Sequence, residues 1–483
     1  MSNSKVFKGV IWASVQRFGT MVISFVTNIV LARLLTPDDF GTIGMLLLFL
    51  AIANTFVDSG FGSALIQKQD ANQDDFSTVF FINLGLSVVV YSILFFGAPW
   101  VARFYNVDIL RPLLRAQGLV LILHAFSIIQ TALLRKRMDF RKLSVCNLIG
   151  NIIGSIVGIG AALMGYGVWS LVIRTLTVGF VSSLLLWVIG RWKPILVFSI
   201  QSFKELFGFG GFMLLSSLVY TFTNNIQTLV IGKLFNAGIL GNYTQARQLR
   251  NVATDSVSSV ISQVFYPDFA NNQDENSALS TKLSFGVQTI SYNVVAIMSL
   301  CILISKPLIL LLYGTKWEPC IPYFKILCVA GLFLSLQDIN INIIAAKGKS
   351  RQLFYFNVAK LLVFVCFMYL GAKIGGIFGL IWGINVYTCV AWLVFAYIST
   401  SLLSQSIWEQ LFTVFKNVLL AIAPFFIVMF ANRLIFDSLS SLLVIIVDSV
   451  LFMSIFLGIS WSTHNTVLLY LFKRIVTFKN SHG

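Results

Sequence analysis

Long apolar segments follow one another along almost the whole chain, and only short polar connections separate them. A helix needs about 20 predominantly apolar residues to cross the hydrocarbon core of a bilayer. On this criterion the sequence predicts spans at residues 10–33, 41–66, 77–100, 112–134, 144–164, 168–190, 205–231, 239–266, 283–305, 321–346, 353–372, 377–400, 411–432 and 441–463. Composition agrees, because 11% of the residues are charged, whereas soluble domains carry about 25%. We therefore expect an all-α integral membrane protein with about 14 transmembrane helices.

The predicted span at 239–266 is unusually polar, since it contains the stretch NYTQARQLRNVATDSVSSVIS at 242–262. Lysine and arginine are enriched in cytoplasmic loops of membrane proteins. If this segment is a span and the N-terminus is cytoplasmic, most of the Lys and Arg residues outside the spans lie on the cytoplasmic side. Without this span the downstream topology inverts and the bias nearly disappears. The charge pattern therefore favours fourteen spans with both termini in the cytoplasm, and the net charge of +16 does not indicate a nucleic-acid partner.

An internal repeat supports the same count. The stretch VLARLLTPDDFGTI at 30–43 aligns without gaps on VIGKLFNAGILGNY at 230–243. The alignment pairs Val30, Arg33, Leu34 and Gly41 with Val230, Lys233, Leu234 and Gly241. Because six predicted spans separate the two copies, both halves enter the membrane in the same direction, which makes the repeat parallel. We expect a six-helix bundle at 1–200, a second at 201–400, and two additional spans with a basic cytoplasmic tail at 401–483.

Polar side chains recur at helical spacing within four of the predicted spans. They are Arg17, Ser24 and Asn28 on the first span, Asn54 and Asp58 on the second, Ser216, Tyr220, Asn224 and Gln227 on the seventh, and Arg247, Arg250, Asn251, Thr254, Ser258 and Ser262 on the eighth. An arginine at the centre of a span costs about 2.5–3.5 kcal/mol on insertion scales, so such residues usually face a cavity or a partner. These spans flank the two repeat joints, which predicts a shared aqueous cavity between the halves.

The residue types indicate what such a cavity binds. The planar guanidinium group of arginine matches phosphate oxygens in a bidentate manner, and amides suit sugar hydroxyls. The candidate substrate-binding residues are Arg17, Asn28, Asn224, Arg247, Arg250 and Asn251. Two alternatives stay open: Arg17 could extend to the membrane interface, and the arginines of the eighth span could form internal ion pairs with Asp255 or Asp58.

Acidic residues within spans are the usual candidates for ion coupling, because a desolvated carboxyl group can hold a proton near neutral pH. The candidates are Asp58, Asp255 and Asp338. The loop pairs Asp38–Asp39 and Asp74–Asp75 resemble metal ligands, but both precede a predicted helix start, where carboxylates stabilise the helix N-terminus. The sequence contains no zinc-ligand spacing, phosphate-binding glycine loop or nucleophile elbow. We therefore predict no metal, no cofactor and no catalytic residue.

The sequence also resembles a known family. The segments that carry the resemblance are LARLLTPDDFGTIGM (31–45), VDSGFGSALIQ (57–67), DDFSTVFFINLGL (74–86), IGKLFNAGILGNYTQARQL (231–249) and VFYPDFANNQ (264–273). They look like those of polysaccharide exporters and O-antigen-type flippases of the multidrug/oligosaccharidyl-lipid/polysaccharide exporter superfamily. The similarity is greatest to the branch that includes colanic-acid and teichuronic-acid exporters. It covers residues 1–400 well and the last two spans by count alone.

The resemblance implies an inner-membrane flippase that moves an undecaprenyl-diphosphate-linked oligosaccharide across the bacterial cytoplasmic membrane by alternating access. It implies two six-span bundles around a cavity, with arginines of spans one and eight holding the diphosphate and spans thirteen and fourteen (411–463) sheltering the lipid tail. Proton or sodium coupling and association with polysaccharide polymerase machinery are implied as well. The alternatives are a cation-coupled multidrug exporter of the same superfamily and a membrane enzyme that uses polyprenyl sugars. An enzyme of that kind normally needs a sizeable extracytoplasmic loop, which this chain does not have.

Overall fold

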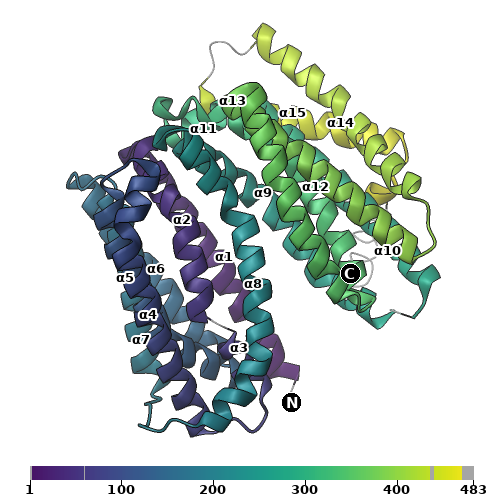
Figure 1. The fold of residues 1–483 in the computed structure, drawn as a ribbon. Helices are drawn as coiled ribbons and strands as arrows, with labels where there is room; N and C mark the ends of the chain where they lie inside the picture. The colour runs from purple at the N-terminus through teal and green to yellow at the C-terminus, as the bar shows by residue number, and fades with distance from the viewer. Residues whose placement is uncertain (1–2, 59, 273, 436–439, 470–483) are drawn as a thin grey trace. The chain divides into compact units, whose positions relative to one another are not determined.

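The protein is helical throughout the part of the chain that the computed structural model describes, which comprises residues 3–58, 60–272, 274–435 and 440–469 (Figure 1). No strand occurs among these residues. The helices are α1 (Asn3–Leu34), α2 (Pro37–Asp58), α3 (Phe61–Gln67), α4 (Gln73–Tyr105), α5 (Leu110–Lys136), α6 (Phe140–Leu163), α7 (Trp169–Gly190), α8 (Ile200–Leu234), α9 (Ala237–Asn271), α10 (Asn276–Leu303), α11 (Ser305–Tyr313), the 3-10 helix η1 (Thr315–Trp317), α12 (Cys320–Ala346), α13 (Ser350–Leu402), α14 (Ile407–Ile435) and α15 (Ser441–Ser462).

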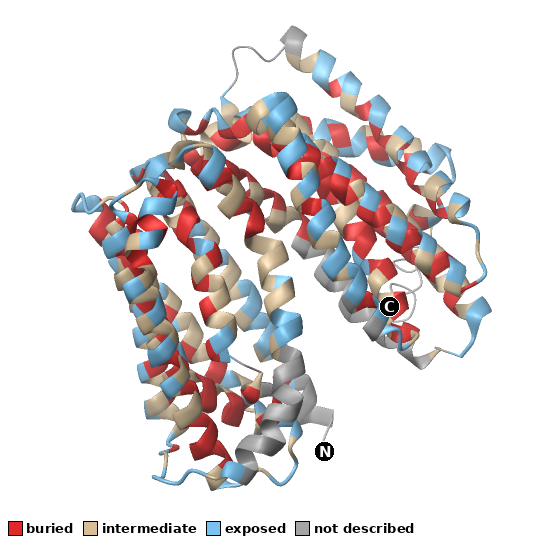
Figure 2. Ribbon diagram, viewed as in Figure 1, coloured by how far each residue is buried: buried red, intermediate tan, exposed pale blue. Residues whose placement is uncertain are grey.

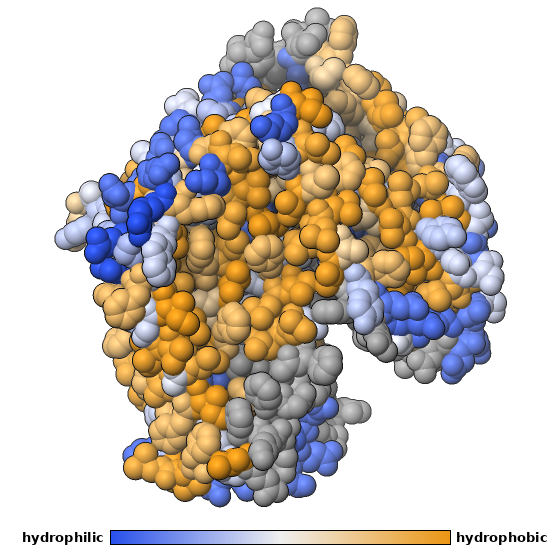
Figure 3. All heavy atoms as spheres, in the orientation of Figure 1, coloured by the Kyte–Doolittle hydropathy of each residue, from blue (hydrophilic) through white to orange (hydrophobic). Residues whose placement is uncertain are grey.

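Helices occupy all of the predicted spans and confirm the expected fold class. Eleven helices of the described chain are long and apolar enough to cross a membrane. This number counts α13 once, although its two arms correspond to two predicted spans, and it does not include α8 and α9, each of 35 residues. Figure 3 shows hydrophobic residues over the sides of the helices and hydrophilic residues gathered near helix ends. Large apolar side chains such as Phe96 and Phe412 are about 70% exposed, as lipid-facing residues are.

The chain forms two compact units, Met1–Gly241 and Asn242–Gly483. In the first unit the most extensive helix pair is α6 with α7. Gly150, Gly154 and Gly158 repeat every fourth residue along the contacting face of α6, and a Cβ atom on Gly154 would lie 3.0 Å from the backbone nitrogen of Val178. Helices in membranes approach closely through such small residues, because packing rather than a hydrophobic driving force holds them together.

A connection of nine residues, 191–199, leads from α7 to α8 and folds back onto the first unit. The indole Nε1 of Trp192 donates to Oε1 of Gln73 at 2.7 Å, and the side chain of Gln130 donates to the carbonyl oxygen of Trp192 at 3.0 Å. The Trp192 ring also packs against Phe80 and Trp187 in an aromatic cluster. These contacts fix the point at which α8 begins, and α8 then packs along α2.

In the second unit α13 bends into a hairpin at Gly375 and Gly376. Gly376 has a φ of +57°, a conformation that L-residues other than glycine rarely adopt. The two arms are in backbone contact, since a Cβ atom on Gly371 would overlap the carbonyl oxygen of Gly379. The hairpin places two spans side by side, α12 and α14 pack against it, and α10 packs against α12 and α14, with buried residues along the contacting faces (Figure 2).

Two local predictions have different outcomes. The capping roles of the acidic pairs are confirmed: the Asp39 carboxylate accepts from the Thr36 backbone nitrogen at 2.9 Å, and Asp75 forms a reciprocal capping box with Asn72. The single span predicted at 41–66 is instead divided, because α2 ends at Asp58 and the short helix α3 begins at Phe61. Gly60, with a φ of +72°, redirects the chain between them.

Candidate substrate site

The first unit carries its predicted polar residues on α1, α2 and α8. Arg17 on α1 is exposed, and no carboxylate of the described residues forms an ion pair with it. Asn28, three turns further along α1, is 6% exposed. The hydroxyl groups of Thr55 on α2 and Thr221 on α8 lie 3.0 Å apart. Asn224, also on α8, is half-buried.

The second unit carries the arginines of α9. Arg250 is 6% exposed, whereas Arg247 is half-buried. Arg250 lies 13 residues beyond the first residue of α9, about 20 Å along the axis at 1.5 Å per residue. The hydrocarbon core is about 30 Å thick, so both arginines lie well inside the span rather than at its end. Both guanidinium groups lie close enough to the buried phenol of Tyr243 to interact with it electrostatically.

The polar stripe predicted on α9 divides into two faces. Arg250 and Thr254 face α12, where a Cβ atom on Gly331 would lie 3.4 Å from Cδ of Arg250 and 2.9 Å from a methyl carbon of Thr254. Arg247 and Asn251 are half-buried beside them. The absence of a side chain at Gly331 therefore allows the Arg250 stem to lie against α12. The predicted residue Asp255, as well as Ser258 and Ser262, lies outside the residues whose side chains the structure describes.

Two of the three acidic candidates, Asp58 and Asp338, each lie near a basic group that the sequence spacing alone did not connect with them. Asp58, at the end of α2, lies within electrostatic reach of His124 on α5, and both residues are exposed. The carboxylate of Asp338 on α12 likewise interacts electrostatically with the ammonium group of Lys360 on α13. Neither His124 nor Lys360 is among the candidate residues that the sequence analysis identifies.

Lys360 is held inside the second unit. Its Nζ atom donates to Oε1 of Gln337 at 2.9 Å and lies 5.2 Å from the ring centre of Phe395. The only signal in the sequence was its position, ten residues into α13 rather than in its first turn. The partner on α12 could not be predicted without the packing of α12 on α13.

An apolar groove of about 820 Å³ runs along the second unit between α12, α13 and α14. Its lining consists of Leu332, Phe333, Trp392, Trp408, Glu409, Leu411, Phe412, Val414, Phe415 and Val418. Only Glu409 among them is charged, and Trp408 and Phe412 are more than two-thirds exposed. A groove of this composition can hold a hydrocarbon chain and offers few partners to a polar molecule.

A chain of apolar helices that carries arginines and amides within its spans, rather than only at their ends, has the character of a polytopic membrane transporter. It belongs to the polysaccharide biosynthesis protein family, whose sequence profile matches residues 30–322. The expected membership in the exporter superfamily is thereby confirmed.

Relatives and solved structures agree with this membership. The chain is 24% identical to the teichuronic acid biosynthesis protein TuaB of Bacillus subtilis, with 81% of each chain covered. It is 26% identical to the lipopolysaccharide biosynthesis protein WzxC of Escherichia coli (78% and 77% covered) and to the succinoglycan biosynthesis transport protein ExoT of Rhizobium meliloti (82% of each).

Among solved structures, the fold is similar to the lipid II flippase MurJ in an inward closed conformation. The TM-score is 0.74 at 13% identity, with 95% of this chain and 100% of that chain covered. An inward-facing multidrug resistance transporter of the MATE family gives a TM-score of 0.65 at 15% identity, with 82% and 98% covered. The protein is thus a multi-pass membrane protein of polysaccharide biosynthesis with a flippase-type transporter fold, and not an enzyme.

Proposed function

We propose that this protein translocates an undecaprenyl-diphosphate-linked oligosaccharide across the cytoplasmic membrane by alternating access. The observation that carries the proposal is the pair Arg247 and Arg250 on one turn of α9, well inside the span. Two fixed cations at this depth suit a diphosphate, because guanidinium groups bind phosphate oxygens through charge-assisted bidentate hydrogen bonds. The half-buried Arg247 makes the direct contact, and the buried Arg250 reinforces the positive potential from behind it.

The rest of the substrate is assigned by polarity. Asn28 and Asn224 in the first unit and Asn251 in the second offer amide groups to sugar hydroxyls. Arg17, which is exposed and forms no ion pair with a carboxylate of the described residues, assists with the diphosphate. The polyprenyl tail occupies the apolar groove beside α14. This division keeps the hydrocarbon chain in an apolar surrounding while the charged headgroup leaves the interface.

We assign ion coupling first to Asp58. It is exposed and lies near His124, so a proton bound there can be shared between two titratable side chains. Asp338 is the second candidate for ion coupling. It ranks second because the ammonium group of Lys360 already lies near its carboxylate and competes with a transported cation. The transported glycan is expected to pass to the polymerase machinery on the far side of the membrane.

The decisive experiment compares Arg247→Ala and Arg250→Ala with wild type in cells that depend on this protein for surface glycan. Loss of one charge-assisted hydrogen-bond partner costs roughly 1.5–3 kcal/mol, so export should fall roughly tenfold or more while the lipid-linked precursor accumulates inside. Arg250→Lys should recover part of the activity, because lysine keeps the charge without the planar fork.

Arg103→Ala is the matched control, since Arg103 is an exposed arginine at the end of α4 and should be replaceable without loss. Export at the wild-type rate in both α9 variants, at wild-type protein levels, would overturn the assignment. A deletion strain that becomes drug-sensitive but accumulates no lipid-linked sugar would favour the multidrug exporter instead.

A further inference from the structure

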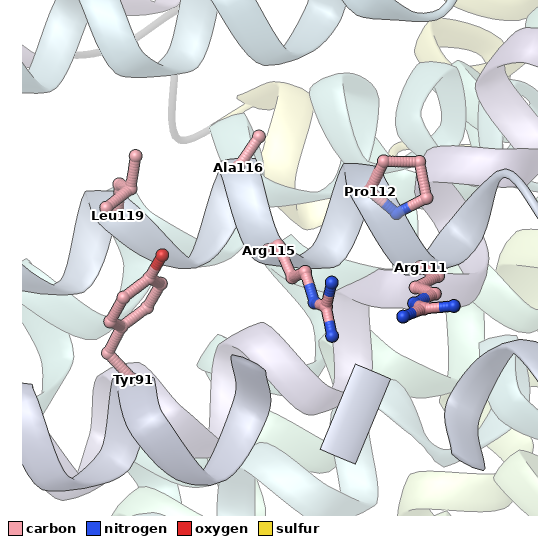
Figure 4. Close-up of a pocket in the computed structure, with 6 residues that line it drawn as sticks. All are labelled: Tyr91, Arg111, Pro112, Arg115, Ala116 and Leu119. Atoms are coloured by element: carbon pink, nitrogen blue, oxygen red, sulfur yellow. The ribbon is translucent and has the colours of Figure 1, made fainter. Parts of the chain in front are cut away.

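A cleft of about 350 Å³ lies between α4 and α5 in the first unit, and none of the residues assigned to the substrate lines it. Its lining consists of Tyr91 on α4 and Arg111, Pro112, Arg115, Ala116 and Leu119 on α5. Figure 4 shows the guanidinium groups of Arg111 and Arg115 beside one another on the same side of α5, with the Tyr91 ring reaching toward that helix from α4. Gly118 makes room for this ring, since a Cβ atom there would lie 3.0 Å from it.

The Arg115 side chain is fixed by a feature of α4. Pro99 has no N–H group, so the carbonyl oxygen of Phe95, four residues earlier, lacks its helical hydrogen-bond donor. Arg115 supplies the missing donor through Nε at 3.1 Å, and its guanidinium carbon lies 4.2 Å from the centre of the Phe95 ring. The terminal nitrogen atoms of Arg115 are thereby held at the cleft.

Arg111 lies one turn before Arg115, in the first turn of α5. Neither arginine forms an ion pair with a carboxylate of the described residues, and this includes the nearby Asp108. The N-terminus of a helix carries a partial positive charge, and a cation beside it increases the positive potential, so that an anion bound there is stabilised. The cleft thus presents concentrated positive charge without an ion-pair partner among the carboxylates of the described residues.

An apolar groove continues from the cleft along the same helix. It has a volume of about 420 Å³ and is lined by Leu119, Ile122 and Leu123 of α5 and by Leu176, Thr177 and Phe180 of α7. Leu119 borders both cavities. Because Arg111, Arg115, Leu119 and Leu123 follow i+4 spacing, the charged cleft and the apolar groove lie along one face of α5.

The position of the cleft matches the headgroup region of a membrane. Trp100 on α4, one residue beyond Pro99, is 68% exposed, and tryptophan is enriched at the membrane–water interface. Arg115 lies five residues from the start of α5, about 7–8 Å along its axis. Positive charge therefore lies at headgroup depth and the apolar groove lies deeper, which is the order of parts in a phospholipid.

From this arrangement we infer that the face of α5 formed by Arg111, Arg115 and the groove beyond Leu119 is a binding site for an anionic glycerophospholipid. The two guanidinium groups hold the phosphate, and one acyl chain follows the groove between α5 and α7. With the predicted cytoplasmic N-terminus, the site lies in the extracytoplasmic leaflet. The site neither uses the proposed substrate residues nor depends on the proposed function.

The test is lipid retention by the purified full-length protein, measured by native mass spectrometry. The probes are phosphatidylglycerol, the zwitterionic phosphatidylcholine and undecaprenyl phosphate. We expect wild type to retain phosphatidylglycerol in preference to the other two. The double variant R111Q/R115Q should retain roughly tenfold less phosphatidylglycerol, because each interfacial cation contributes to the attraction of anionic lipid.

Two further variants separate the site from general charge effects. R103Q removes an arginine at the same end of α4 that bonds to the Pro99 carbonyl oxygen at 3.4 Å and does not line the cleft, so retention should be unchanged. L119W places a larger side chain where the two cavities share a lining residue and keeps both charges, so phosphatidylglycerol retention should fall. If the double variant does not fold, L119W alone tests the site. Unchanged retention in both R111Q/R115Q and L119W, an equal loss in R103Q, or preferential retention of undecaprenyl phosphate that R111Q/R115Q abolishes would overturn the inference.

Discussion

Gly41 and Gly241 make the same contact in opposite directions. A Cβ atom on Gly41 would overlap the backbone carbonyl group of Ala237, and one on Gly241 would overlap that of Pro37. Pro37 and Ala237 are the first residues of α2 and α9, and they occupy equivalent positions in the internal repeat. The two repeat joints, both in the part of the chain assigned to the first unit, therefore meet through a local two-fold relationship.

This reciprocity predicts that Gly41→Ala and Gly241→Ala have equal effects. Each new methyl group meets backbone, which cannot rotate away as a side chain can, so the joint must separate. We expect each substitution to lower stability by roughly 1–3 kcal/mol, as overpacking of a close contact does. Melting temperatures of the detergent-solubilised protein provide the measurement.

Gly97→Ala is the control for these variants, because a Cβ atom at Gly97 in α4 meets nothing within 4 Å. Its helical position favours alanine over glycine, so stability should stay the same or rise slightly. A melting temperature for Gly41→Ala equal to that of Gly97→Ala would show that the joint is loose, contrary to the contact described above.

Much of the fold could be predicted because it depends on short-range pattern. Apolar segment length predicts the spans, and the equivalence of Gly41 and Gly241 predicts the repeat. The roles of Asp39 and Asp75 follow from helix-capping chemistry, which involves residues three positions apart. The break at Gly60 could not be predicted in this way, since the apolar pattern continues across it into α3.

The site could be predicted less completely, because its decisive contacts join distant helices. The spacing of Arg247 and Arg250 puts them on one turn, but which of them is buried depends on Gly331 of α12. The anchoring of Lys360 depends likewise on Gln337. In the same way, the donation from Arg115 to Phe95 requires the pairing of α4 with α5, even though Pro99 marks the vacant carbonyl oxygen in the sequence.

A buried polar cluster should hold α14 against the second unit. The Asn340 side-chain oxygen on α12 accepts from Ser399 Oγ on α13 and from Gln410 Nε2 on α14, the latter at 3.3 Å. All three residues are at most 3% exposed. Asn340→Ala leaves both donors without this acceptor, and we expect a loss of roughly 1 kcal/mol, since side-chain hydrogen bonds between membrane helices average about 0.6 kcal/mol and reach about 1.7.

The comparison variant is Ser462→Ala, which removes an exposed hydroxyl group bonded to the carbonyl oxygen of Ile459 in its own helix. Thermal unfolding of the two purified proteins should differ, with Ser462→Ala close to wild type. Equal melting temperatures would indicate that the cluster contributes nothing to the seating of α14.

The assignment of coupling to Asp58 predicts a selective defect. In proteoliposomes, an imposed proton gradient should accelerate translocation by the wild type and have little effect on Asp58→Asn, because the amide cannot exchange a proton. Asp58→Glu should retain part of the response. Asp108→Asn, in the exposed turn before α5, is the matched control and should respond fully. Full stimulation of Asp58→Asn would exclude this carboxylate from coupling.

The apolar groove beside α14 predicts a variant that distinguishes the tail from the headgroup. Val418 lines the groove, and Val418→Trp should fill part of it and slow translocation of a full-length polyprenyl substrate severalfold. The bilayer is as apolar as the groove, so the defect should lie in the passage of the lipid rather than in a large loss of binding free energy. Val450→Trp, at a position 58% exposed on α15, should have no effect. An analogue with a short prenyl tail does not reach along the groove, so wild type and Val418→Trp should translocate it at the same rate. Equal slowing of both substrates would instead mean that the tryptophan disturbs the second unit as a whole.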